Sequence, residues 1–115
     1  MKRELVYFSQ LQTDIEYLIG KNDQDNFNVI DNAKPNDIWF HLNDYPSCHV
    51  VALIPNNINK KNMKYITKQG ALLCKQNSKY KLEKNLSIVY TQVKNITKTD
   101  KIGLVISTNT KIIQI

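Results

Sequence analysis

The second half of the chain is rich in lysines, whose ammonium groups bind phosphate as point charges without reading bases. Residues 59–115 contain twelve lysines and two acidic residues, whereas residues 1–58 contain four basic and eight acidic residues. This segregation predicts a one-sided positive field that attracts polyanions and steers their approach. The alternative is a solvated, lysine-rich surface, because lysine, asparagine and isoleucine are all abundant in the chain.

Six of these lysines recur at helical spacing. At about 100° per residue they fall within one arc of a helix predicted over residues 59–79, which gives a basic stripe about 30 Å long. The stripe consists of Lys60, Lys61, Lys64, Lys68, Lys75 and Lys79. Extended by Lys94 and Lys98, it is the predicted contact surface for a polyphosphate. The alternative is the solvated face of an ordinary amphipathic helix.

Lys21 follows a predicted strand and precedes a predicted helix. Backbone N–H groups at a helix N-terminus bind phosphate, and Lys21 would add positive charge there. Asp23 and Asp25 would repel the same anion, so a turn with a solvated lysine is the competing interpretation.

Trp39 and His41 fall on one face of a predicted strand and could stack a nucleic-acid base. The preferred interpretation is a buried tryptophan beside a hydrogen-bonded histidine, because the surrounding run is apolar. His41, Asp44, Cys48 and His49 are all metal-ligand types, but they lack the pairwise spacings of structural zinc sites. We therefore expect no metal and no cofactor.

Catalysis is not expected either. Cys48 and His49 are neighbours on a predicted strand, so their side chains point to opposite faces and cannot act as a local nucleophile and base. A catalytic pair of Cys74 with His41 or His49 is left as an alternative, although nothing in the sequence supports it.

Two cysteines are too few for a disulfide framework and indicate a reducing compartment. Without an apolar run of ~20 residues or a signal-peptide pattern, the expected location is the cytoplasm, with no membrane contact.

Glycines and prolines divide the chain into short elements that would position these residues. The predicted strands cover residues 4–8, 14–19, 37–42, 48–54, 86–93, 102–106 and 111–115, and the predicted helices cover 23–33 and 59–79. The first two strands form a hairpin, and Ser107–Thr110 would close another between the last two strands. Strands 37–42 and 48–54 are apolar on both faces, as expected for central strands covered by helices.

Each predicted helix has one apolar face. The short helix, with Asn22 or Asp23 as its cap, would bury Phe27, Ile30 and Ala33. The long amphipathic helix would bury Met63, Ile66, Gly70, Leu73 and Cys74. The pattern predicts an α+β fold with a mostly antiparallel mixed sheet of about six or seven strands, within a chain length that fits one domain.

Several of these segments resemble the NFACT-R domain in order and spacing. The first half supplies Gly20-Lys21-Asn22, Asn26, Asp37-Ile38-Trp39-Phe40-His41 and His49-Val50-Val51. The second half supplies Ser78-Lys79, Ile88-Val89-Tyr90-Thr91, the basic turn from Lys94 to Lys98, and Gly103. The resemblance covers about residues 17–115, and the Asp-Ile-Trp-Phe-His and His-Val segments are its specific part.

The NFACT-R domain is the RNA-binding domain of tRNA-recruiting factors in ribosome-associated quality control, and it also occurs in eukaryotic coiled-coil proteins. The resemblance implies a single, stand-alone domain over residues 1–115 that binds RNA, either tRNA or rRNA, without catalysis. The lysine pattern and the resemblance together predict a nucleic-acid-binding set of Lys21, Asn22, Asn26, His41, His49, Lys64, Lys68, Lys75, Ser78, Lys79, Lys94 and Lys98.

Two departures from the family pattern affect the expected strength of phosphate binding. Pro46-Ser47-Cys48-His49 replaces the common Pro-Gly-Ser-His, and Thr97 stands where the basic turn often has arginine, which binds phosphate in a bidentate way. The N-terminal domain, coiled coil and C-terminal domain of larger relatives are not expected here, so their full activity is not carried over. Two alternatives stay open: a module that docks on a ribosomal or quality-control protein through its acidic half, and a DNA-binding module.

Overall fold

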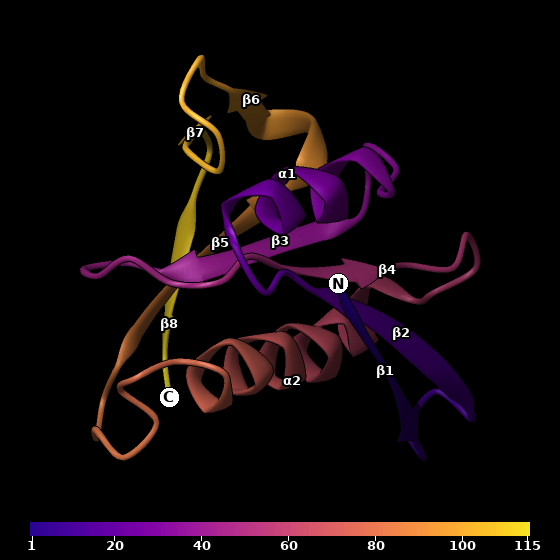
Figure 1. Ribbon diagram of the computed structural model, residues 1–115. Coiled ribbons are helices and arrows are strands. Elements are labelled where there is room, and N and C mark those ends of the chain that lie inside the picture. Colours follow the sequence, from indigo (N-terminus) through magenta and orange to yellow (C-terminus); the bar gives the residue numbers. More distant parts are fainter.

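Two helices cover opposite faces of a six-stranded antiparallel sheet in the computed structural model, which describes residues 1–115 (Figure 1). The sheet has the order β1-β2-β4-β3-β5-β8. Its strands are β1 (Lys2–Phe8), β2 (Thr13–Ile19), β3 (Ile38–Leu42), β4 (Val50–Leu53), β5 (Ser87–Gln92) and β8 (Lys111–Gln114). The helices are α1 (Asp23–Asp31) and α2 (Met63–Gln76), and the 3₁₀ turns are η1 (Lys60–Asn62) and η2 (Val93–Asn95). A separate two-stranded sheet joins β6 (Ile96–Lys98) to β7 (Val105–Ser107).

Strands β3 and β4 lie in the middle of the sheet, as their two-sided apolar pattern predicts. Phe40 and Val50 belong to the cluster on the α2 side, whereas Trp39 and Val51 belong to the cluster on the α1 side. Successive strand residues point to opposite faces, so each helix covers one apolar surface. The predicted α+β class is confirmed, although every strand pair is antiparallel and the sheet is therefore not mixed.

Helix α1 begins at the Asn22 cap, whose side-chain oxygen accepts a backbone hydrogen bond at 2.8 Å within the first turn. The residues buried on α1 are Asn26 and Val29. The predicted inward face is confirmed in part, because Ile30 and Ala33 are half-buried and pack against the apolar cluster on this side of the sheet. The half-buried Phe27 is not part of that packing. The polar Asn26 takes an inward place because its side-chain oxygen accepts the backbone N–H of His49.

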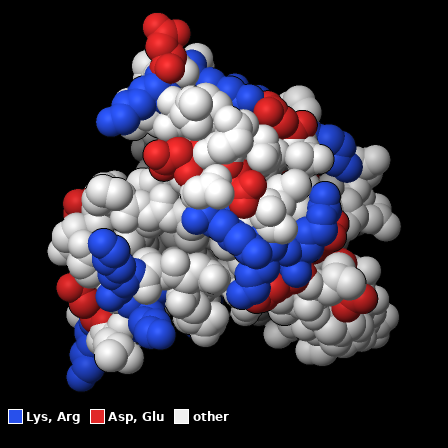
Figure 2. All heavy atoms as spheres, viewed as in Figure 1, with Lys and Arg blue, Asp and Glu red and all other residues white.

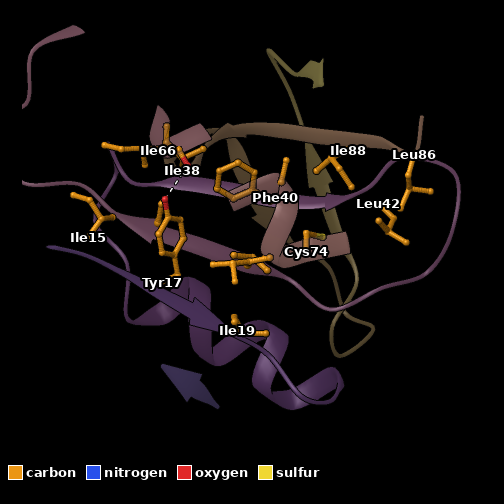
Figure 3. Close-up of a cluster of buried hydrophobic side chains, with 14 of the residues drawn as sticks. Ile15, Tyr17, Ile19, Ile38, Phe40, Leu42, Ile66, Cys74, Leu86 and Ile88 are labelled. Carbon is orange, nitrogen blue, oxygen red and sulfur yellow. Dashed lines mark hydrogen bonds between the residues drawn. The ribbon is translucent and has the colours of Figure 1, made fainter. Parts of the chain in front are cut away.

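Helix α2 packs so closely on the sheet that a side chain at Gly70 would overlap the Phe40 ring. A glycine inside a helix costs about 1 kcal/mol relative to alanine, and here the close approach of helix and strand explains it. Ile66 and Cys74 are buried on the same face, as the helical spacing predicts. Figure 3 shows them beside Phe40 and Tyr17, whose hydroxyl donates to the Ile66 carbonyl oxygen at 2.8 Å.

The long helix is shorter than predicted. Residues 60–62 form the turn η1, and α2 ends at Gln76, where the backbone N–H of Asn77 bonds to the Leu73 carbonyl oxygen at 3.1 Å. At about 1.5 Å per residue, α2 is therefore about 21 Å long and not 30 Å. Neither α1 nor α2 has the length and apolar character of a membrane-spanning helix.

The C-terminal strands do not form the predicted closing hairpin. Strand β7 pairs with β6, whereas β8 pairs with β5 at the edge of the main sheet. The backbones of Gly103 (φ 85°) and Asn109 (φ 53°) adopt left-handed conformations at the turns. The Thr91 hydroxyl lies 3.0 Å from the Thr108 carbonyl oxygen and 3.1 Å from that of Asn109, so β5 anchors the start of β8.

Candidate nucleic-acid interface

Buried hydrogen bonds connect the residues at the centre of the sequence motif. Trp39 Nε1 donates to His49 Nδ1 at 3.1 Å, and the His49 backbone N–H donates to the Asn26 side-chain oxygen at 3.0 Å. A Cβ atom at Gly20 would overlap that same oxygen. These four residues therefore hold together the end of β2, α1, β3 and the start of β4.

Both histidines lie against Trp39, which is only 3% exposed. Desolvation, helped by the neighbouring His41, lowers the pKa of His49 to about 3. Desolvation also lowers the pKa of His41, whose ring stacks on Trp39 with centroids 5.7 Å apart. Both rings are therefore neutral at pH 7. Trp39 is too buried to stack a base, and ligand contacts by His41 and His49 stay predictions.

A pocket of about 540 Å³ opens at the end of the sheet where this network reaches the surface. The end of β2, the start of α1, the loop before β4 and the segment after α2 form its walls. We call it the motif pocket, and it brings together Lys21, Asn22, Asn26, Ser78 and Lys79 from the predicted set. Residues from distant parts of the sequence thus converge here, as a binding site requires.

Lys2 also lines the motif pocket, and sequence reasoning missed it. The register of the first hairpin places Lys2 opposite Ile19, directly before Gly20. The predicted strand began at residue 4, two residues too late. Extending the pairing outward from the turn would have found this lysine.

Ser78 shapes the pocket and does not point a free hydroxyl into it. Its hydroxyl donates to the Lys75 carbonyl oxygen at 2.7 Å and accepts the Tyr80 backbone N–H at 3.1 Å. These bonds fix the turn that follows α2, so Ser78 positions Lys79 beside the pocket.

Acidic residues weaken the positive potential at the motif pocket. Asp23 lines the pocket, and Asp25 stands in the first turn of α1. The N-terminal ammonium lies 3.1 Å from Asp25 and, with the Lys21 backbone N–H, holds the pKa of that carboxyl below its usual value. Lys21 and Lys79 form no ion pair, so they are the available cations for a phosphate.

The predicted stripe of six lysines is interrupted. Lys64, Lys68 and Lys75 share one side of α2, but the Lys75 ammonium donates to the Ile115 carbonyl oxygen at 3.0 Å. The other three lysines lie before or after α2, because the helix is shorter than predicted. On the face in Figure 2, basic side chains gather in separate groups: near the N-terminus, over the loop after α2, and on the β6–β7 hairpin.

Most lysines of the second half nevertheless form no ion pair with an Asp or Glu side chain. Of the twelve lysines in residues 59–115, only Lys98 forms an ion pair, with Asp31. Its ammonium also lies 5.0 Å from the centroid of the Phe27 ring. The other ion pairs join the N-terminus, Lys2 and Arg3 to acidic residues of the first half. The charge asymmetry of the sequence is therefore retained by the fold.

The cysteines and histidines are not arranged as a catalytic pair. Cys48 packs with the cluster on the α2 side, whereas His49 contacts Trp39 on the other face of the sheet. Cys74 lies against Cys48, with its Sγ 4.0 Å from the Cys48 carbonyl oxygen. The Cys48 thiol and burial together raise the pKa of Cys74, so it stays protonated. No group of three or more His, Cys, Asp or Glu side chains is placed to hold a metal ion.

The sequence matches the family described as "NFACT protein RNA binding domain" over residues 5–113. The chain belongs to this family. The NFACT RNA-binding domain here is 28% identical to the coiled-coil domain-containing protein 25 homolog of Dictyostelium discoideum, over 83% of this chain and 47% of that protein. The predicted resemblance is thus confirmed.

The fold of this NFACT RNA-binding domain is also similar to a solved structure. This is the C-terminal part of the fibronectin/fibrinogen-binding protein from Streptococcus suis, with a TM-score of 0.81. The sequences are 23% identical, and the match covers 100% of this chain and 45% of that one. The chain spans about half the length of the relatives it matches.

Proposed function

We propose that the chain acts as one cytoplasmic domain that binds the phosphate backbone of tRNA or rRNA, in translation or ribosome quality control, without catalysis. The observation that carries this proposal is that eleven of the twelve lysines in residues 59–115 pair with no Asp or Glu side chain, since only Lys98 does so. Membership of an RNA-binding family supports RNA as the ligand.

The motif pocket offers a defined place for one phosphate. Lys21 and Lys79 supply unpaired positive charge, and the Asn22 side-chain oxygen is already used as the α1 cap, which fixes the neighbouring backbone. Lysines bind phosphate without reading bases, so this contact would recognise RNA by backbone and shape. Asp23 and Asp25 weaken the potential there, so we expect further contacts elsewhere to contribute to affinity.

Replacing Lys21 and Lys79 together by glutamine tests the motif pocket. We expect the affinity for tRNA, measured by fluorescence anisotropy, to fall by about tenfold, because both unpaired cations that would hold the phosphate are lost. The matched control replaces Lys84 and Lys101 by glutamine, because these exposed lysines lie outside the motif pocket. That control should lose less than about threefold. Equal losses in the two variants would remove the pocket from the proposed site.

Salt dependence separates this function from its alternatives. About six phosphate contacts on a single strand give a slope of about −4 in a plot of log affinity against log salt. A flat plot would contradict the proposal. Equal affinity for a DNA hairpin of the same sequence would instead favour a DNA-binding module.

Protein docking is the second candidate function, and strand β1 favours it. Leu5 and Tyr7 are 69% and 63% exposed on this edge strand, opposite Glu16 and Asp14 in the hairpin. Exposed apolar side chains on an edge strand are typical of a contact surface. Replacing Leu5 and Tyr7 by serine should leave tRNA affinity unchanged, so loss of ribosome association with intact RNA binding would favour docking.

A further inference from the structure

A second hollow lies at the opposite end of α2 from the motif pocket. Its volume is about 720 Å³, within the range of sites that hold small ligands. Parts of β3, β5 and β8 form its floor, and η1, the first turns of α2 and η2 form its walls. We call it the lysine groove, after its four lysines: Lys60, Lys64, Lys94 and Lys111.

The charge of the lysine groove differs from that of the motif pocket. Its four lysines come from four different elements, no acidic residue lines it, and none of the four forms an ion pair. The start of α2 adds to this potential, because its first turn has no acidic residue and the Asn62 side chain does not cap it. The groove is therefore the more favourable of the two hollows for an anion.

Hydrogen bonds hold the groove in shape. The buried Thr91 hydroxyl lies 3.1 Å from the Asn109 carbonyl oxygen, and the Asn95 side-chain amide donates to Thr91 Oγ at 3.0 Å. These bonds tie η2, which carries Lys94, and the turn before Lys111 to the same position on β5. The convergence of the lysines is thus set by the fold.

An aromatic ring lines the groove beside these charges. Tyr90 is the strand partner of Lys111, and its half-buried ring stacks on Phe40 with centroids 6.0 Å apart. The amide side chains of Gln92 and Asn95 line the same space and can donate or accept hydrogen bonds. Cations beside an aromatic ring and amide groups match a nucleotide, which offers a phosphate, a flat base and polar base edges. An acidic peptide would use only the charge.

We propose that the lysine groove binds one nucleotide unit of an RNA chain, with the phosphate among the lysines and the base against Tyr90. This inference rests on the proposed RNA-binding function. The groove and the motif pocket are separated by the length of α2, about 21 Å at 1.5 Å per residue. They therefore hold different segments of the same RNA.

A triple substitution, Lys64→Gln, Lys94→Gln and Lys111→Gln, tests the groove on the whole chain. We expect the affinity for single-stranded oligoadenylate to fall at least about tenfold, and the salt slope to become shallower by about 0.7, as for one phosphate contact on a single strand. The matched control is Lys81→Gln, Lys84→Gln and Lys101→Gln, because these exposed lysines line neither hollow. The control should lose less than about threefold. Equal losses in the two variants would overturn the inference.

The ring is tested with oligoadenylate that carries the fluorescent base 2-aminopurine. Stacking on Tyr90 should quench its fluorescence in the wild type and in Tyr90→Phe, but not in Tyr90→Leu. Tyr90 also packs on Phe40, so replacing it changes the packing of the sheet as well as the groove. NMR titration of the wild type with oligoadenylate locates the contact without any substitution. Shifts in the amide signals of residues 90–95 and 109–111 are expected, and their absence would overturn the inference.

Further probes separate the possible outcomes. Adenosine monophosphate that binds the groove as tightly as oligoadenylate would assign it to a free nucleotide and overturn the RNA assignment. Polyglutamate that competes as well as RNA would assign it to an acidic protein, with the same consequence. RNA binding that depends on Lys21 and Lys79 but not on the groove lysines would overturn the groove inference and leave the proposed function intact. A wild type that binds no RNA would overturn both the proposed function and the groove inference.

Discussion

Gly20, Asn26 and His49 illustrate how residues of a binding-domain motif serve the fold. The Asn26 oxygen occupies the space that a side chain at Gly20 would need, and it accepts the His49 backbone N–H. The His49 ring in turn accepts the Trp39 N–H inside the molecule. Loss of one partner leaves a buried polar group unsatisfied, which costs about 1–3 kcal/mol. Gly20, Asn26 and His49 therefore position the loop that carries Lys21.

His49 makes stability depend on pH. Its pKa is about 3 when folded and near 6.5 in the unfolded chain, so the unfolded state binds an additional proton between these values. Stability should therefore fall as pH drops from about 6.5 towards 3, by up to about 1.4 kcal/mol per pH unit from this group. Urea unfolding midpoints between about pH 7 and pH 4.5 measure the effect.

His49→Asn is the comparison for this effect, because the amide oxygen can accept the Trp39 N–H but binds no proton in this range. We expect the variant to show a shallower pH dependence than the wild type. Equal pH dependence in the two proteins would contradict a buried, neutral His49.

Among the elements, those with long apolar patterns could be predicted from the sequence. The two-sided apolar runs of β3 and β4 and the helical spacing of Ile66 and Cys74 define the main layers, because burial dominates their placement. The pairing of β6, β7 and β8 could not be predicted. It depends on contacts between distant residues, such as those of Thr91 with the turn at Asn109, which short-range patterns do not contain.

The packing of α2 on β3 gives a stability prediction. Gly70→Ala should destabilise the protein by about 1–3 kcal/mol, because the added methyl group would overlap the Phe40 ring, even though alanine favours helices by about 1 kcal/mol. Urea unfolding measures the difference. Lys68→Ala is the control at an exposed position of the same helix and should change stability by less than about 0.5 kcal/mol. A Gly70→Ala variant more stable than the wild type would contradict this packing.

The arrangement of the whole molecule explains why only part of the site was predicted. The motif pocket collects residues that the family resemblance already named, such as Lys21 and Lys79. The lysine groove forms only when β8 pairs with β5, which brings Lys111 beside Tyr90. Since the sequence predicted a different partner for β8, it could not reveal this groove. The fold therefore places two basic hollows at the two ends of α2.

This separation predicts a dependence on RNA length. At a rise of about 3.4 Å per stacked nucleotide, about six steps along a strand span 21 Å, so shorter oligoadenylates can occupy only one hollow at a time. Affinity, measured by anisotropy, should rise steeply above about six nucleotides, because the second contact becomes intramolecular. The lysine-groove triple variant should lack this rise. An equally gradual increase in both proteins would contradict two-site binding.

The contrast between the two cysteines provides a natural labelling position. Cys48 is half-buried at the motif pocket, and its hydrogen bond with Cys74 lowers its pKa, whereas Cys74 is sealed in the interior with a raised pKa. Thiolates react with maleimides and iodoacetamides far faster than thiols do. A dye added to the native chain would therefore attach at Cys48, where its emission would report directly on occupancy of the pocket.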